Sequence, residues 1–314
     1  MNEKPATVSI VIASYNSAPF LPATIGSCLE QTHAAHEVIV IDDGSTDETT
    51  AACAQFGGRI IYERVENGGV SRARNIGAQR SSAEWLIFLD SDDILRPTAI
   101  ADLLRTVQAG AAGVAYGMVL QRERPGKLPK LNGFDFCAGP PVFSSQKNFR
   151  RCAIITPGSA IVKKSLHAEV GGFVTGYEPM EDRDFWIKCG FLAPIAFCDT
   201  VVLDKTWREG SAGSNDAKRI YRSFWAQKYL RPWCAARSLD FSWAGSDADF
   251  VRDALKDALY WRADSVLAPL REQCPAHGYQ GIWYYRAQVR EFFLRLRGRL
   301  PAEPAWVKVR PSIS

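Results

Sequence analysis

Short apolar runs alternate with helix-like segments through the first 110 residues, and this alternation constrains the fold more than any other feature of the chain. Residues 8–13 are VSIVIA, residues 38–41 are VIVI and residues 85–89 are WLIFL. Each run is nearly continuous in apolar residues and is followed by a turn and a segment with helical spacing. Strands of this kind, alternating with helices, predict a mostly parallel α/β sheet with helices on both faces.

The expected elements follow in a regular order along the chain. Strands are predicted over residues 8–13, 38–41, 60–62, 85–89 and 159–162. Helices are predicted over residues 19–31, 48–56, within 67–80, over 97–107 and from Pro179 onward. Residues 121–151 are rich in Pro, Gly and basic residues and have little periodicity, so we interpret them as a lid or an insertion.

Acidic residues come directly after two of the predicted strands. Asp42 and Asp43 follow the second strand, and Asp90, Asp92 and Asp93 lie in the stretch FLDSDD. Ligands of such sheets lie beyond the carboxyl ends of the strands. Carboxylates this close together repel one another unless positive charge lies among them. We therefore expect a ligand site at this edge of the sheet that includes positive charge.

The stretch FLDSDD predicts a site for a divalent cation. In an extended segment alternate side chains project to the same side, so Asp90 and Asp92 would face one way. Two carboxylates at a strand end suit a hard cation such as Mn²⁺ or Mg²⁺, which keeps several waters and shares its other ligands with phosphate oxygens. The alternative is a solvated turn, with Asp93 capping the helix near Pro97.

Five motifs, taken in order, resemble the family 2 glycosyltransferases. They are VSIVIASYN, VIVIDDGSTD, NGGVSRARNIG, FLDSDD and GGF…MEDRDFW, and the resemblance covers about residues 7–215. It implies the Rossmann-like GT-A fold and transfer of a sugar from a nucleotide-sugar donor with inversion at the anomeric carbon. It also implies that the divalent cation is a cofactor.

The resemblance implies a set of donor-binding residues. They are Ser14, Tyr15, Asp43, Arg74, Asn75 and Asp90. Asp43 matches the position that hydrogen-bonds the base, typically uracil, and a carboxylate accepts well from an imide N–H. A UDP-sugar is therefore the favoured donor. Asp92 would be the direct metal ligand, with Asp90 nearer the ribose, whereas for Asp42 we favour a role in bracing its loop.

The motif MEDRDFW implies the catalytic base. Asp182 matches that position, and an acceptor hydroxyl needs a carboxylate within hydrogen-bond reach to take its proton. Glu181 and Trp186 are expected to contact the acceptor or to support the base. The alternative is that Asp182 is only an acidic residue in the first turn of a helix, stabilised by the helix dipole.

One stretch departs from the family pattern. Many members close a His-containing loop over the diphosphate after the last strand, but residues 203–214, LDKTWREGSAGS, contain no His. Lys205, Trp207 and Arg208 are the candidates to take its place, and arginine suits the geometry of phosphate. We therefore add Arg208 to the predicted donor-binding residues.

The last hundred residues differ from the rest in charge and pattern. We predict a catalytic domain over residues 1–214, with a nucleotide-binding half over 1–110 and an acceptor half over 111–214. Residues 215–314 are predicted to form a helical extension, and they hold 17 Lys and Arg against 10 Asp and Glu. Such an excess of positive charge suggests an anionic partner.

A basic amphipathic helix is predicted near the end of that extension. Residues 286–299, RAQVREFFLRLRGR, contain five Arg and one Glu, and Val289, Phe292, Phe293 and Leu296 fall on one helical stripe. This pattern predicts peripheral contact of residues 282–300 with an anionic membrane surface. The alternative is a helix packed on the catalytic domain with solvated arginines. No nucleic-acid recognition motif accompanies the basic residues, so we expect no nucleic-acid partner.

The sequence as a whole supports one main hypothesis and two alternatives. We expect a cytoplasmic protein, because no apolar run reaches membrane-spanning length, the first residues lack a signal peptide and the eight Cys are scattered. The main hypothesis is a transferase acting on a glycan or lipid-linked glycan acceptor in surface polysaccharide synthesis. The alternatives are a sugar nucleotidyltransferase and an inactive sugar-nucleotide-binding protein.

Overall fold

The protein is described by a computed structural model in which the chain divides into two compact units. The first consists of Met1–Thr175 and Glu181–Arg208, and the second of Gly176–Met180 and Glu209–Ser314. The described residues are 5–122, 128–132, 156–176, 181–206, 230–239, 246–260, 263–275, 279–296 and 301. The predicted domain boundary between residues 214 and 215 lies outside them.

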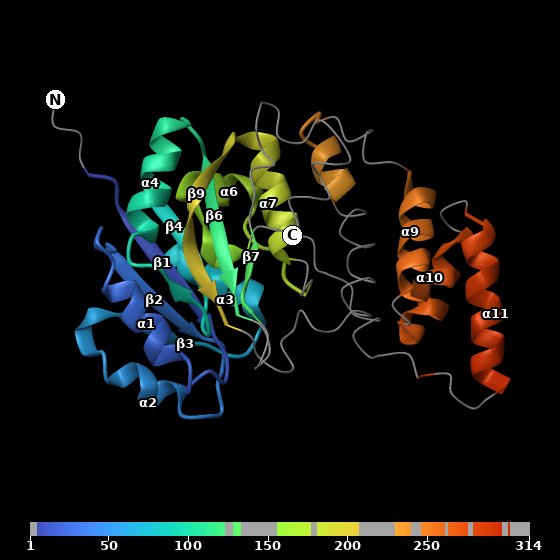
Figure 1. The fold of residues 1–314 in the computed structure, drawn as a ribbon, viewed down its shortest axis with the longest axis horizontal. Helices are drawn as coiled ribbons and strands as arrows, with labels where there is room; N and C mark the ends of the chain where they lie inside the picture. Colours follow the sequence, from blue (N-terminus) through green and yellow to red (C-terminus); the bar gives the residue numbers. More distant parts are fainter. Residues whose placement is uncertain are drawn as a thin grey trace. The chain divides into compact units, whose positions relative to one another are not determined.

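The first unit is built on one sheet with the strand order β3-β2-β1-β4-β8-β6-β9-β5, and β7 pairs with β6 (Figure 1). The strands are β1 Val8–Ser14, β2 Glu37–Asp42, β3 Ile61–Arg64, β4 Trp85–Asp90, β5 Ile94–Leu95, β6 Val114–Gln121, β7 Lys130–Asn132, β8 Ala160–Lys163 and β9 Ile195–Lys205. Strands β3, β2, β1 and β4 are parallel, as predicted. Beyond them the sheet is mixed, because β8 is antiparallel to both β4 and β6 while β9 is parallel to β6.

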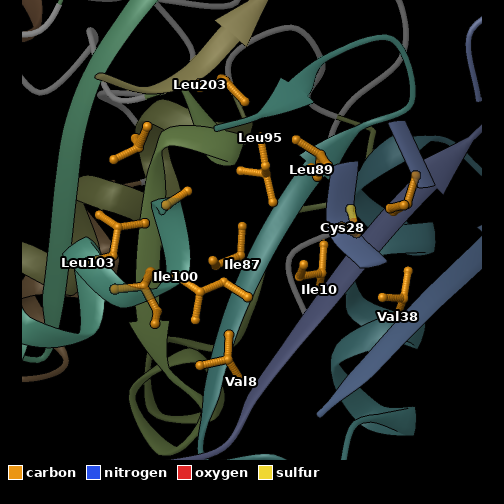
Figure 2. Close-up of a cluster of buried hydrophobic side chains, with 14 of the residues drawn as sticks. Val8, Ile10, Cys28, Val38, Ile87, Leu89, Leu95, Ile100, Leu103 and Leu203 are labelled. Atoms are coloured by element: carbon orange, nitrogen blue, oxygen red, sulfur yellow. The ribbon is translucent and has the colours of Figure 1, made fainter. Parts of the chain in front are cut away.

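Helices cover both faces of this sheet. They are α1 Leu21–Leu29, α2 Thr49–Ala54, α3 Val70–Arg80, α4 Ala99–Ala109, α6 Lys164–Val170 and α7 Glu181–Leu192. Strand β1 shows how the faces divide, because its alternate side chains point to opposite sides. Val8, Ile10 and Ile12 join a large apolar cluster with residues of α1 and α4, as Figure 2 shows for part of it. Ala13 on the other face packs with Ala73 of α3.

The second unit is helical in its described part. It contains α9 Asp247–Tyr260, α10 Leu267–Gln273 and α11 Ile282–Leu296, with one 3₁₀ turn at Asp264–Val266 between α9 and α10. Its core includes the fully buried side chains of Val251, Leu255, Leu267 and Leu270. Within the described residues of either unit, no helix has both the length and the apolar character needed to cross a bilayer.

Candidate active site

The carboxyl ends of β1, β2 and β4 lie side by side, and each ends in a polar residue. Ser14 of β1 pairs in register with Asp42 of β2, and Ala13 pairs with Asp90 of β4. The parallel register therefore brings the two acidic stretches to one edge of the sheet, where the sequence places the ligand site.

Asp42 and Asp43 both hold the loops at this edge. The Asp42 carboxylate is fully buried and accepts hydrogen bonds from the Ser45 amide at 2.8 Å and the Tyr62 hydroxyl at 2.7 Å, which supports the bracing role we favoured. The Asp43 carboxylate accepts from the amides of Gly68 and Gly69, both at 2.8 Å. Each Asp43 oxygen keeps a further lone pair. The predicted contact with a base remains a prediction.

The loop after β1 is tied to the loop after β2. Ser14 is buried, and its hydroxyl has no hydrogen-bond partner among the described residues. Tyr15 leaves 48% of its surface exposed. The Asn16 side chain then accepts from the amides of Thr46 and Asp47. Tyr15 is thus half-exposed in a loop at the sheet edge, where the sequence predicted a donor contact.

The acidic stretch after β4 is a turn, and this corrects the extended segment that we expected. Strand β4 ends at Asp90, and the Asp93 amide donates to the Asp90 carbonyl at 3.1 Å. Asp92 is partly buried and Asp93 is buried. Asp93 does not cap the helix near Pro97, because that helix starts after Thr98 and has no side-chain cap; the Asp93 carboxylate instead accepts from the Thr206 amide at 2.9 Å. The turn thus buries the Asp93 side chain, while Asp90 and Asp92 keep some exposure to solvent.

Lys205 supplies one of the positive charges that the acid cluster requires. Its Nζ lies 3.4 Å from Asp93 Oδ2 and 3.6 Å from Asp90 Oδ2. Strand β9 places it there, because β9 pairs with β5 immediately after the acidic turn, in the register Ile94 to Asp204. Burial alone would lower the pKa of Lys205, but the surrounding carboxylates outweigh it and raise that pKa. Burial raises the pKa of Asp93 to about 7, although Lys205 opposes the shift.

Arg74 of α3 supplies the other charge and joins two motifs that are far apart in the sequence. Its guanidinium is buried, and it donates to Asp90 Oδ1 at 2.7 Å and to Glu181 Oε1 at 2.8 Å. The ring of Phe173 lies 5.2 Å from the guanidinium carbon. Burial works against the charged form of Arg74, but Asp90 and Glu181 outweigh it and raise its pKa. Arg74 therefore fixes the end of β4 to the start of α7.

Asp182 lies beside this ion-pair network in the first turn of α7 and is partly exposed. Its Oδ1 accepts from the Arg183 amide at 2.7 Å. Burial raises the pKa of Asp182, the negative charge of Asp90 adds to that rise, and Arg74 opposes it. A carboxylate whose pKa is raised holds a proton more readily, which is the property required of a general base. Asp182, Asp90, Arg74 and Lys205 therefore form one electrostatic cluster.

Two other predicted site residues have different surroundings. The Asn75 amide pairs with the backbone of Phe173, donating to its carbonyl at 2.8 Å and accepting from its N–H at 2.9 Å. Trp186 is fully buried, with its ring 4.8 Å from that of Phe185. Asn75 thus holds the backbone at Phe173, and Trp186 packs in the core. The predicted contacts of Asn75 with the donor and of Trp186 with the acceptor remain predictions. Arg208 lies outside the described residues.

The acid cluster fits a divalent cation only in part. Among the described residues, no three His, Cys, Asp or Glu side chains come together as a complete metal site. Asp90 and Asp92 both retain some exposure, and carboxylate oxygens are the ligands that Mg²⁺ and Mn²⁺ prefer. One or two carboxylates suffice where phosphate oxygens complete the shell. The residues present therefore fit a cation held jointly with a diphosphate, and the metal remains a prediction.

Comparison with known proteins decides the family. The model for Glycosyl transferase family 2 matches residues 9–171. The chain belongs to glycosyl transferase family 2. An uncharacterized glycosyltransferase of Rickettsia typhi is 39% identical to it over 232 residues, which is 70% of each chain. The family match favours the first of our three hypotheses, that the protein is a glycosyltransferase.

Other relatives of this family 2 glycosyltransferase are more distant and differ in length. Glycosyltransferase GlyG of Streptococcus pneumoniae is 31% identical over 176 residues, which is 52% of this chain and 58% of GlyG. An uncharacterized glycosyltransferase of Haemophilus influenzae is 27% identical over 186 residues. The chain spans 61% of that protein and 33% of a further relative from Rickettsia conorii.

A solved structure confirms the fold of the family 2 glycosyltransferase. Residues 1–349 of S. aureus TarS superimpose with a TM-score of 0.60 over 93% of this chain and 92% of that one, at 17% identity. At such low identity the likeness concerns the fold alone. The predicted GT-A fold is confirmed.

Sequence reasoning missed two features of the site. It proposed Lys205 only as a cover for the leaving group, and it gave Arg74 no part in joining motifs. Recognition of β9 as a strand would have placed Lys205 at a carboxyl end, beside the acids. A positive charge was also required by repulsion among Asp90, Asp92 and Asp93, but we assigned that charge to a metal alone.

Proposed function

We propose that this protein is an inverting glycosyltransferase that moves a sugar from a nucleotide-sugar donor to a hydroxyl of a glycan or lipid-linked glycan. The observation that carries the proposal is the ion-pair network at the carboxyl edge of the sheet. Through Arg74 it joins Asp90 at the end of β4 to Glu181, and it sets Asp182 next to them. A UDP-sugar is the favoured donor. Structures of S. aureus TarS, which has the same fold, are described as complexes with UDP-GlcNAc and with UDP.

In the proposed reaction Asp182 takes the proton of the acceptor hydroxyl. The acceptor oxygen then bonds to the anomeric carbon while the bond between that carbon and the diphosphate oxygen breaks, and the electron pair leaves with the nucleotide diphosphate. A single displacement of this kind inverts the anomeric configuration. The raised pKa of Asp182 supports its assignment as base, since proton transfer is most efficient when the pKa of the base is near the working pH.

The charges around Asp182 suit a negatively charged leaving group. Lys205 is partly exposed and Arg74 is buried, so of the two Lys205 is the cation that a diphosphate can reach from solvent. Mn²⁺ or Mg²⁺ held by Asp92 and Asp90 would offset the negative charge of the departing diphosphate. Asp43 is proposed to contact the nucleotide base, Ser14, Tyr15 and Asn75 to line the nucleotide pocket and Arg208 to contact phosphate.

The acceptor and the cellular setting are proposed without support from individual residues of the site. We favour surface polysaccharide synthesis at the cytoplasmic face of a membrane, in line with the sequence prediction of a cytoplasmic protein. The relatives do not indicate this setting, and the chain spans only 33% of the relative from Rickettsia conorii and 58% of GlyG.

A panel of nucleotide sugars tests the proposed function. The chain is incubated with each donor and Mn²⁺, and free nucleotide, pyrophosphate and thermal stability are measured. We expect nucleotide release and stabilisation with one donor, both reduced by EDTA and by Asp92→Ala. Asp199→Ala, which removes an exposed carboxylate of β9, serves as the control. A parallel incubation contains a sugar phosphate and a nucleoside triphosphate. Release of pyrophosphate there would identify a nucleotidyltransferase instead, and binding without turnover of any donor would identify an inactive binding protein.

A further inference from the structure

Helix α11 of the second unit carries an exposed apolar stripe. Ile282 is 62% exposed, Tyr285 55%, Val289 55%, Phe292 58% and Phe293 50%. At 100° per residue these positions fall within one arc of about 100° on the helix surface. Sequence analysis predicted the part of this stripe from residue 289 onward, and the structure extends it by two turns toward the start of the helix.

The opposite face of α11 is fixed to the rest of the second unit. Ala287 and Glu291 are buried, and the Glu291 carboxylate accepts from Arg271 Nε at 2.9 Å. Arg290 donates through Nη2 to Asp264 Oδ2 at 2.8 Å. Both partners lie in the same helical unit. The helix therefore cannot turn its apolar stripe inward without breaking these two ion pairs.

Arginines border the stripe on both sides. Arg286 and Arg295 are exposed and lie on opposite sides of the apolar arc, about 20° and 60° beyond its edges at 100° per residue. The guanidinium of Arg286 lies 4.8 Å from the ring of Trp283. Helix α11 contains one acidic residue, Glu291, and it is buried on the other face. The exposed face of α11 is therefore apolar along its middle and positively charged along its borders.

We propose that this face of α11 docks the protein on an anionic lipid surface. Phe292, Phe293 and Val289 would enter the boundary between headgroups and acyl chains, and the bordering arginines would meet anionic headgroups. A second copy of the chain is a poorer partner, because a contact between two such faces brings arginine against arginine. At 15 residues α11 is about 22 Å long, too short to cross a bilayer, so the helix would lie in the plane of the surface.

Vesicle co-sedimentation of the full chain tests this proposal. We expect binding to vesicles of equal parts phosphatidylcholine and phosphatidylglycerol, weaker binding to phosphatidylcholine alone, and loss of binding as KCl is raised. The double variant Phe292→Ser/Phe293→Ser should bind about a hundredfold more weakly, since each phenyl ring contributes strongly when it leaves water. Its control is Tyr260→Ser, which removes a 77% exposed aromatic ring of α9 outside the stripe.

A second pair of variants separates the charges from the apolar contact. Arg286→Gln/Arg295→Gln should weaken binding to the anionic vesicles about fivefold for each arginine and leave binding to phosphatidylcholine unchanged. Arg59→Gln/Arg80→Gln removes the same net charge from exposed positions of the first unit and should have no effect. All of these positions are exposed, so melting curves should match the wild type.

Two results would overturn the proposal. One is equal vesicle binding by the wild type and Phe292→Ser/Phe293→Ser, or no binding by either. The other is sedimentation of the wild type without lipid as a dimer that the same double variant converts to a monomer, which would make this face an interface between copies. Neither result bears on donor turnover, so this proposal and the proposed function are tested separately.

Discussion

Replacement of Arg74 by methionine should destabilise the first unit strongly, because Arg74 neutralises two carboxylates in a buried setting. It is 3% exposed, and its partners Glu181 and Asp90 lie at 2.8 and 2.7 Å. Glu181 is buried, so removal of its cation carries close to the full cost of breaking a buried ion pair, about 3–5 kcal/mol. Asp90 adds less, since its side chain is 28% exposed and keeps Lys205 at 3.6 Å. We expect a total loss near the upper end of this range, about 5 kcal/mol in the free energy of unfolding.

Arg80→Met is the matched control for this substitution. Arg80 lies on the same helix and makes two guanidinium–carboxylate hydrogen bonds to Glu63, at 2.6 and 2.8 Å, but the pair is exposed to solvent. Exposed ion pairs contribute little, so this variant should be nearly as stable as the wild type. Hydrogen exchange of peptides from β1 and β4 across a urea series reports the first unit by itself. Equal destabilisation by the two variants would refute the argument from burial.

Arg74→Met also makes a prediction about pH. Arg74 opposes the rise in the pKa of Asp182, so its removal should raise that pKa further. If Asp182 is the base, it must be deprotonated to act. The acidic limb of the profile of kcat/KM against pH should therefore move to higher pH in Arg74→Met and stay in place in Arg80→Met.

Two further predictions concern packing and buried charge in the first unit. Gly77→Ala should destabilise the first unit by about 1–3 kcal/mol although alanine favours helices, because the new Cβ would lie 2.2 Å from Val11 Cγ1. Gly26→Ala should stabilise it by about 1 kcal/mol, because nothing lies within 4 Å of the new Cβ. The urea midpoints of the two variants check this. Burial lowers the pKa of His167 to about 4 from 6.5. Between these two pH values the imidazole is protonated in the unfolded state and neutral in the folded state. The free energy of unfolding should therefore fall by about 3 kcal/mol as the pH falls through this window. His167→Phe, which keeps a ring beside Phe88, should lack that loss, and a constant stability difference between variant and wild type across the window would contradict the assignment.

The sequence predicted the nucleotide-binding half of the fold well, for a physical reason. Strands β1, β2 and β4 are short and buried on both faces, so each appears as a continuous apolar run between turn residues. The mixed part of the sheet, formed by β8, β6 and β9, was harder to predict from the sequence. Strands β6 and β9 are longer and less uniformly buried, β9 pairs with β6 across a shift in register, and β6 pairs with β8 and β9, which both lie far from it in the chain. Local periodicity carries no information about such pairings.

The site was predictable in its acids and less so in its cations. Acids at strand ends are recognisable because the strands themselves are. Arg74 was assigned to the donor from its motif, but its ion pair with Glu181 joins residues 107 positions apart and depends on how α3 and α7 pack. Lys205 required the strand β9 to be known. The extended conformation assumed for FLDSDD failed because β4 ends at Asp90 and the chain turns to form β5.

The central claim is that Asp182 removes the proton of the acceptor while Asp90 and its neighbours hold the donor. The most direct measurement combines donor binding by calorimetry with single-turnover transfer, for Asp182→Asn and for the exposed-carboxylate control Asp199→Asn. We predict that Asp182→Asn binds the donor with wild-type affinity and transfers its sugar about 10²–10⁴-fold more slowly, while Asp199→Asn is unchanged in both. Transfer by Asp182→Asn at the wild-type rate would contradict the account.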